Sequence, residues 1–133
     1  MENRGEKAVW LKHNGHNCCQ AVLAAFAGEA GLEPETLKKL GAAFGTGMGC
    51  MEATCGALCG AEMLLGLAEY QGAPLRARAK EMYRVFEERC GATLCKDLKG
   101  VATGQMLCSC DDCVRHAADI AEEMLLWGGE ETA

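Results

Sequence analysis

Hydrophobic residues recur every three or four positions along most of the chain, which is the spacing of amphipathic helices. The clearest stripe lies between Pro74 and Gly91 and consists of Leu75, Ala79, Met82, Tyr83, Phe86 and Cys90. A second stripe follows Cys110 and consists of Val114, Ala117, Ala121 and Leu125. No segment alternates between hydrophobic and polar residues as a half-buried strand does. The pattern therefore predicts an all-α fold.

Capping residues and helix breakers divide this pattern into five or six short helices. We expect helices over residues 2–13, 18–30, 34–44, 54–70, 74–90 and 110–127, with a single turn at 93–99. Asn17 and Thr54 are placed to cap two of them, and Ser109 and Asp112 form a capping box for the last. Because 133 residues suit one domain, residues 1–133 are predicted to form one compact helical bundle.

The stretch CMEATCGALCGA (50–61) is the most unusual of the chain. A cap at Thr54 would place Cys55 in the first turn of a helix and Cys59 one turn later on the same face. The N–H groups and the positive dipole end of a helix start stabilise a thiolate. Gly56 and Gly60 each cost a helix about 1 kcal/mol relative to Ala. Something must therefore approach this helix closely, either another helix or a bulky inorganic group.

The net charge of −6 makes nucleic acid and anionic membranes poor partners. The longest apolar run, residues 21–28, is too short to span a bilayer. The first ten residues contain no apolar signal-peptide core, so we expect a cytoplasmic protein.

In that reducing compartment, ten cysteines are not expected to form a disulfide framework. They indicate metal binding, redox activity or catalysis, although several can be simple core residues.

Four of the cysteines share a local context. Cys18, Cys55 and Cys110 fall in the first turns of predicted helices, and Cys95 lies in the short turn at 93–99. Helix starts provide N–H donors and positive charge for thiolate ligands. Four thiolates would complete an iron–sulfur cluster or a tetrahedral zinc site. The spacings C-x4-C-x3-C at 50–59 and C-x2-C at 110–113 match no familiar run, so spacing alone does not identify the metal.

Four short motifs carry a resemblance to a known family. They are N-C-x-Q-A-V at 17–22, C-G-A-x-x-G-A at 55–61, F-E-x-R-x-G-x-x-x-C at 86–95 and C-x-x-x-V-R-x-A-A at 110–118. Together they make the chain, from about residue 8 to residue 126, similar to the redox-active proteins named for their C–GCAxxG–C–C cysteine pattern. The resemblance extends to a related domain of split-Soret cytochromes.

The resemblance implies that the family's four cysteines correspond to Cys18, Cys55, Cys95 and Cys110, and that they hold an iron–sulfur or similar centre. We therefore expect a [4Fe-4S] or [2Fe-2S] cluster that serves electron transfer or redox sensing. One alternative is a metal-free dithiol/disulfide oxidoreductase with Cys55 as its low-pKa thiolate. Another is a structural zinc module. The chain lacks C-x-x-C-H, so no c-type haem is expected.

Six cysteines lie outside the family pattern. Four of them are candidate additional thiols: Cys19, Cys50, Cys59 and Cys113. Together with Cys90 and Cys108, they could support a second centre, replace a ligand, act as resolving thiols or simply fill the core.

Small side chains predict an assembly. Gly56 and Gly60 leave a flat strip on the central helix, beside a second strip of Ala53, Ala57 and Ala61. Such a surface packs well against a copy of itself, and two-fold homodimers are the commonest oligomers. We therefore expect a homodimer with this helix at or near its interface; the alternative is that the strip packs only against the helix at 18–30 within one subunit. The sequence does not identify a redox partner protein.

Overall fold

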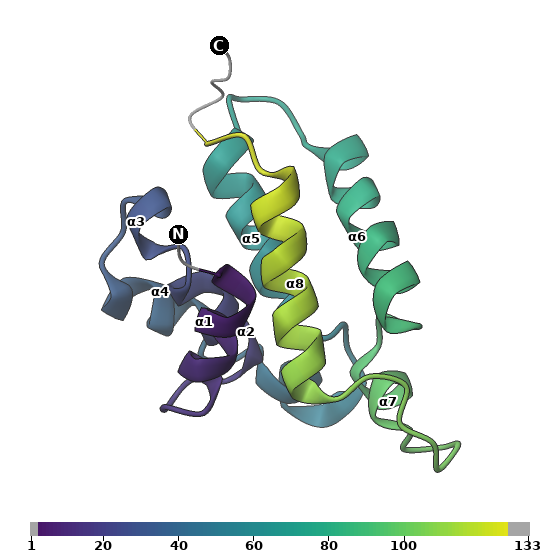
Figure 1. Cartoon of the computed structure of the whole chain (residues 1–133). Coiled ribbons are helices and arrows are strands. Elements are labelled where there is room, and N and C mark those ends of the chain that lie inside the picture. The colour runs from purple at the N-terminus through teal and green to yellow at the C-terminus, as the bar shows by residue number, and fades with distance from the viewer. Residues whose placement is uncertain (1–2, 128–133) are drawn as a thin grey trace.

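The structure, a computed structural model, describes residues 3–127 and contains helices and loops (Figure 1). The helices are α1 (Arg4–Lys12), α2 (Cys18–Ala24), α3 (Ala27–Ala30), α4 (Pro34–Gly41), α5 (Gly56–Glu69), α6 (Arg76–Cys90), α7 (Cys95–Lys99) and α8 (Cys110–Met124), and η1 (Gly47–Met51) is a wide turn. The predicted all-α fold is confirmed. Within residues 3–127, six helices have seven or more residues, which agrees with the number expected.

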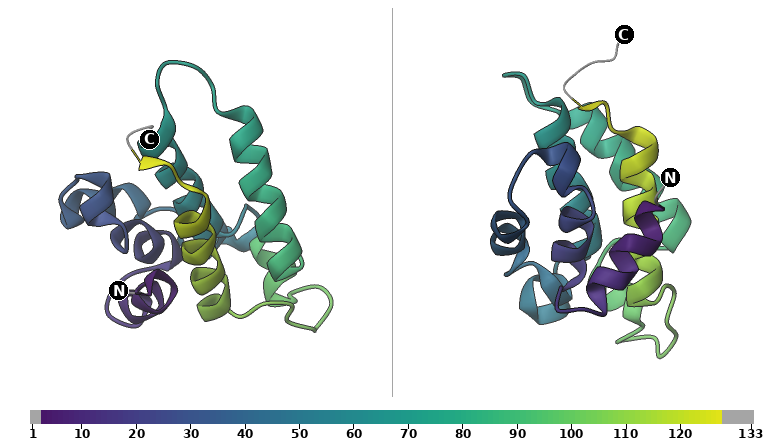
Figure 2. Two further views of the ribbon diagram at one scale, coloured as in Figure 1. Left: turned by 45° about the horizontal axis from the view of Figure 1, so that its top comes forward. Right: turned by 60° about the vertical axis from the view of Figure 1, so that its left-hand side comes forward.

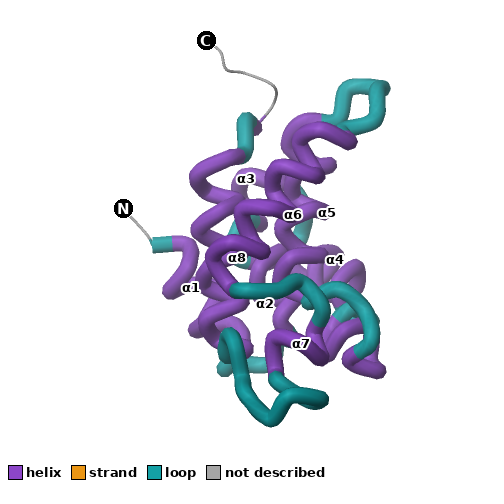
Figure 3. The backbone as a smooth tube through the Cα atoms, turned by 90° about the vertical axis from the view of Figure 1, so that its right-hand side faces the viewer, coloured by secondary structure: helices purple, strands orange, loops and turns teal. Residues whose placement is uncertain are grey.

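The long helices α5, α6 and α8 form the centre of the bundle. Figure 2 shows α1–α4 grouped on one side of α5 and α8, with α6 on the other side. The contacts of α5 with α2 and α8, and of α8 with α1 and α6, enclose the core. Phe26, Leu58, Leu64, Phe86 and Val114 are among the side chains buried there. Figure 3 shows the loop between α7 and α8 projecting from one end of this bundle.

The segment 18–30 is not one helix, as predicted, but two. Phe26 leaves the helical conformation, with φ −115° and ψ 22°, and its N–H donates to the Leu23 carbonyl at 3.1 Å. This break turns the Phe26 ring into the core, where it is 2% exposed and stacks on Trp127 at a centroid distance of 6.4 Å. Burial of a large aromatic ring therefore outweighs the local helical preference of the sequence.

Two predicted helix starts are also wrong. Thr54 does not cap α5; Cys55 is its N-cap residue, because Thr54 pairs with Leu94 in an isolated antiparallel bridge. Helix α6 begins at Arg76 rather than at Pro74.

Two predicted caps are present and fix the starts of cysteine-bearing helices. The Asn17 side chain accepts from the Gln20 N–H at 2.8 Å, and the Gln20 side chain accepts from the Asn17 N–H at 2.8 Å. The Ser109 hydroxyl accepts from the Asp112 N–H at 3.1 Å, but the Asp112 carboxylate accepts from Arg115 instead, so the predicted capping box is only half formed. Because these bonds each satisfy one N–H group in the first turn of α2 or α8, they hold Cys18 and Cys110 at defined positions.

The two glycines of α5 pack within the chain. A Cβ at Gly60 would lie 2.9 Å from the Cys19 carbonyl oxygen, and one at Gly56 would lie 2.5 Å from the Phe44 carbonyl oxygen. The close approach that these glycines predicted is therefore made by α2 and by the segment before η1. Both glycines are buried, so they are not available to a second subunit. Across residues 3–127, no helix combines the length and apolar character needed to cross a membrane.

Candidate metal centre

Four cysteines line one cavity of about 120 Å³: Cys18, Cys55, Cys95 and Cys110. Each lies at the start of a different helix. Cys18, Cys95 and Cys110 are the first residues of α2, α7 and α8, and Cys55 is the N-cap of α5. The starts of α5 and α8 lie beside α7 at the lower end of the bundle in Figure 1. The structure thus brings together the four cysteines that the sequence singled out.

The remaining wall of the cavity comes from the Gly-rich segment before α5, from Gly56 at the start of α5 and from one lysine. Thr46, Gly47 and Met51 line it, and all three have positive φ angles. Gly47 packs so closely that a Cβ on it would lie 2.7 Å from the Cys95 Cβ. Lys99, the last residue of α7, is the one charged side chain among the described lining residues.

Cys110 is the most acidic thiol of this cavity. The Cys18 thiol donates a hydrogen bond to its thiolate, which lowers the pKa of Cys110 to about 5. Burial opposes this shift, while the charges of Lys99 and Lys12 support it. The same hydrogen bond raises the pKa of Cys18 well above its ordinary value. The shared hydrogen bond therefore favours one thiolate within the Cys18–Cys110 pair, and Lys99 and Lys12 stabilise its charge.

The pKa of Cys55 is shifted in the opposite direction. Its hydrogen bond with Cys113 and its burial raise its pKa well above the ordinary value, although the N–H groups of Ala57 and Leu58 act in the other direction. The expectation that Cys55 is a low-pKa thiolate is therefore wrong. The helix start does provide the predicted N–H donors, but burial beside a second thiol outweighs them.

A second group of cysteines lies in the core next to this cavity. The sulfur atoms of Cys90, Cys108 and Cys113 are all within 4.8 Å of one another, and all three residues are buried. Such a group could hold a metal ion. The sequence offered only a weak signal for it, because Cys90 ends one helix, Cys108 lies in a loop and Cys113 is in the first turn of another.

The other candidate thiols lie outside both groups. Burial raises the pKa of Cys19 to about 12 and that of Cys59 to about 11. Cys59 is half-buried, and its thiol donates to the Thr54 carbonyl at 3.9 Å. Cys50 is exposed on η1. These three do not line the four-cysteine cavity.

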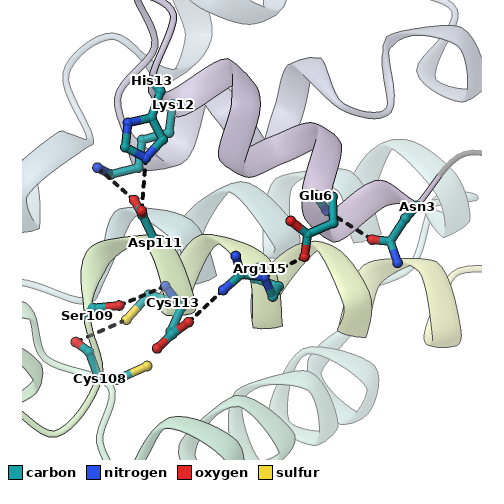
Figure 4. Close-up of polar contacts among 10 residues, drawn as sticks. Asn3, Glu6, Lys12, His13, Cys108, Ser109, Asp111, Cys113 and Arg115 are labelled. Carbon is teal, nitrogen blue, oxygen red and sulfur yellow. Dashed lines mark hydrogen bonds and ion pairs between the residues drawn. The ribbon is translucent and has the colours of Figure 1, made fainter.

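Ion pairs hold α1 against the start of α8, next to Cys110. Asp111 pairs with Lys12 at 3.2 Å and shares a hydrogen bond with His13 at 2.9 Å, and Arg115 pairs with Glu6 at 2.8 Å (Figure 4). All of these groups are partly exposed, so each pair contributes little stability by itself. Their effect is to fix the position of α1 on α8.

The all-α fold, the cysteine-lined cavity and the buried cysteine group define a cysteine-rich protein that is capable of binding metal. Residues 16–124 match the family described as "Putative redox-active protein (C_GCAxxG_C_C)". Because the match covers well over half of the chain, the protein belongs to this redox-active family. No curated protein and no solved structure matches the chain.

Proposed function

We propose that the protein is a small iron–sulfur protein that transfers electrons or senses redox state in the cytoplasm. Cys18, Cys55, Cys95 and Cys110 would hold a [4Fe-4S] or [2Fe-2S] cluster. The observation that carries this proposal is the meeting of four cysteines, from four separate helix starts, around one cavity. All ten cysteines of the chain are free thiols, which suits a reducing compartment.

The size of the cavity favours a cluster over a single ion. Its volume of about 120 Å³ far exceeds the roughly 10–15 Å³ that one water molecule needs. A tetrahedral zinc ion with bonds of about 2.3 Å would hold four sulfur atoms about 3.8 Å apart. Within residues 3–127, the only three ligand atoms within 4.8 Å of one another belong to Cys90, Cys108 and Cys113. The cavity cysteines are therefore spread more widely than one zinc ion requires.

The surroundings of the cavity suit an anionic centre. The N-termini of the two long helices α5 and α8 meet there, and their partial positive charges favour thiolates. The N–H groups of Ala57 and Leu58 act to lower the pKa of Cys55, and the Lys99 ammonium lines the same space. Hydrogen bonds to sulfur and nearby positive charge are known to set the reduction potential of such centres.

When bound, the cluster would supply one-electron chemistry; the chain itself binds it and controls its exposure to water. Cys55 and Cys95 are 3% and 5% exposed, whereas Cys18 and Cys110 are half-buried. The side formed by Cys18 and Cys110 is therefore nearer to solvent. We expect a redox partner to approach the cavity from that side, because electron transfer is favoured by a short distance to the centre.

Metal analysis of protein purified without oxygen tests this proposal. We expect iron and acid-labile sulfide together with broad visible absorption, and their loss in Cys55→Ser and Cys95→Ala. Cys50→Ser is the matched control, because Cys50 is exposed and outside the cavity. Zinc without colour would show a structural zinc module instead. Equal iron retention in all variants would place the cluster elsewhere.

One observation favours a second candidate, a dithiol/disulfide oxidoreductase. The Cys110 thiolate, hydrogen-bonded by the Cys18 thiol, has the character of an attacking nucleophile. Cys110 would attack a substrate disulfide and release one substrate thiolate. Cys18 would then lose its proton, attack the Cys110 sulfur and release the second thiolate. The products are a Cys18–Cys110 disulfide and a reduced substrate.

The oxidoreductase candidate has its own test in iron-free protein. If it is correct, mild oxidation produces a Cys18–Cys110 disulfide that a dithiol reverses, as mass spectrometry of peptides would show. The alkylation rate of Cys110 should rise around pH 5 in the native sequence and at higher pH in Cys18→Ala. Unchanged alkylation in Cys18→Ala, with no such disulfide, would exclude this candidate.

A further inference from the structure

We propose that Cys90, Cys108 and Cys113 form a second metal site, distinct from the cavity, which binds one soft monovalent ion, Cu(I), through three thiolates. The argument uses only these residues and their neighbours. It does not depend on the identity of the centre in the cavity.

The spacing of the three sulfur atoms fits a single ion. All three lie within 4.8 Å of one another. An ion with metal–sulfur bonds of about 2.3 Å places three equatorial sulfur atoms about 4.0 Å apart. Small side-chain movements would therefore complete the site. The three side chains belong to the packed core, with exposures of 3%, 7% and 0%, so the group is shielded from water.

The chain holds these residues in place through its backbone. Cys108 is fixed because the N–H groups of Leu107 and Cys108 both donate to the Leu98 carbonyl, at 2.9 and 3.2 Å. The Cys113 thiol donates to the Cys108 carbonyl at 3.8 Å, and Figure 4 shows these two cysteines beside each other. Cys90 comes from the opposite side, as the last residue of α6. Contacts within the chain thus bring the three cysteines together.

The number of ligands selects the ion. Among residues 3–127, no fourth cysteine, histidine or carboxylate joins this group, and its burial leaves no place for a water ligand. Closed zinc sites almost always use four protein ligands. Thiolate ligands also select Cu(I), a soft ion that is stable with three of them. Cys55 contacts Cys113, but it lines the cavity and does not lie within 4.8 Å of all three sulfur atoms.

A charged neighbour distinguishes this group from cysteines that only fill the core. Three thiolates and one Cu(I) carry a charge of about −2, which is costly to bury without a counter-charge. The Lys99 ammonium lies 3.7 Å from the Cys113 sulfur and donates to the Cys108 carbonyl at 3.3 Å. It supplies one positive charge beside the site. Lys99 also lines the neighbouring cavity, so its positive charge lies between the two groups of cysteines.

Anaerobic titration with Cu(I) in the presence of a chromophoric chelator tests the site. The triple variant Cys18→Ala/Cys95→Ala/Cys110→Ala removes most thiols of the cavity, and we expect it to retain about one equivalent of Cu(I). Adding Cys108→Ala should abolish this retention, whereas adding Cys50→Ala should not. Alanine is used because it introduces no unpaired buried hydroxyl. No retention by the folded triple variant, or equal retention in both quadruple variants, would overturn the proposal.

The native chain provides a second test in case the triple variant does not fold. There, Cys108→Ala should bind one equivalent of Cu(I) fewer than Cys50→Ala, with circular dichroism as the check that both are helical. X-ray absorption of the triple variant, or of Cys50→Ala if the triple variant is unfolded, should show copper bound only by sulfur. Equal stoichiometry of the two single variants would overturn the site. If zinc stays bound at this site when an equal amount of Cu(I) is added, the assignment of the metal as Cu(I) is wrong.

Discussion

Cys55 and Cys95 are held side by side by the backbone rather than by their side chains. The Cys55 N–H donates to the Thr93 carbonyl at 2.8 Å, and the Cys95 N–H donates to the Ala53 carbonyl at 3.0 Å. These two bonds flank the single bridge between Thr54 and Leu94. Two cysteines distant in sequence are thereby fixed on one wall of the cavity by backbone hydrogen bonds, which is how a site is preorganised.

The contact of Gly47 with Cys95 leads to the first prediction. We expect Gly47→Ala to weaken the cavity wall, because the new Cβ would lie 2.7 Å from the Cys95 Cβ and φ is +55°. The expected loss of stability is about 2–3 kcal/mol, from strain and steric overlap together. Chemical denaturation measures that loss, and iron content after anaerobic purification measures retention of the centre.

Gly49→Ala is the matched control for Gly47→Ala. Gly49 also lies in η1 with a positive φ of +84°, but a Cβ there would meet nothing within 4 Å. It should lose only about 1–2 kcal/mol from backbone strain and keep its iron. Equal losses in the two variants would show that the contact with Cys95 does not matter.

Much of this site could be predicted from local sequence. The caps at Asn17 and Ser109 mark helix starts, and so they place Cys18 and Cys110 where N–H groups are free. The spacing of Gly56 and Gly60 correctly indicated a close approach, although it could not say which segment approaches. These features depend on neighbouring residues, which is why the sequence reveals them.

The remaining features depend on contacts between distant segments. Thr54 was expected to cap α5, but its pairing with Leu94 makes Cys55 the cap residue, and no local pattern indicates that pairing. The group of Cys90, Cys108 and Cys113 forms only when the end of α6 meets the start of α8. The direction of the pKa shift of Cys55 likewise follows from burial beside Cys113.

A pH dependence of stability is expected from Glu62. Burial raises the pKa of this carboxyl from 4.5 to about 7, and its Oε1 atom is buried without a hydrogen-bond partner. The folded state therefore binds the proton more tightly than the unfolded state. The resulting stabilisation is complete below about pH 4.5 and is lost as the pH rises through about 7. Partial exposure limits the effect to roughly 1 kcal/mol.

Glu62→Gln tests this expectation. We expect the free energy of unfolding of the variant to fall less than that of the native protein between about pH 5 and pH 8. Denaturant titration at several pH values provides the measurement. Glu122→Gln removes a charge from an exposed position and serves as the control. Parallel pH profiles for the native protein and Glu62→Gln would contradict the assignment.

The homodimer expected from the sequence stays a prediction, with a changed interface. Light scattering at micromolar concentration should give a mass of twice 14.1 kDa. The glycines of α5 pack inside the subunit, so the interface must use other surfaces. A mass near 14.1 kDa would show a monomer.

The packing of α5 on α2 gives the last prediction, which compares two glycines of one helix. At Gly60 a Cβ would lie 2.9 Å from the Cys19 carbonyl oxygen and 3.1 Å from the Val22 Cβ, whereas at Gly66 it would meet nothing within 4 Å. Gly60→Ala should therefore lose about 1–2 kcal/mol, because steric overlap with the backbone exceeds the gain in helix propensity. Gly66→Ala gains helix propensity without steric overlap, so it should be more stable than the native protein by about 0.5–1 kcal/mol. Thermal and denaturant unfolding of both variants measure these changes in stability. Similar changes for the two substitutions would mean that α2 does not pack on Gly60, and that the strip formed by Gly56 and Gly60 is free for a partner.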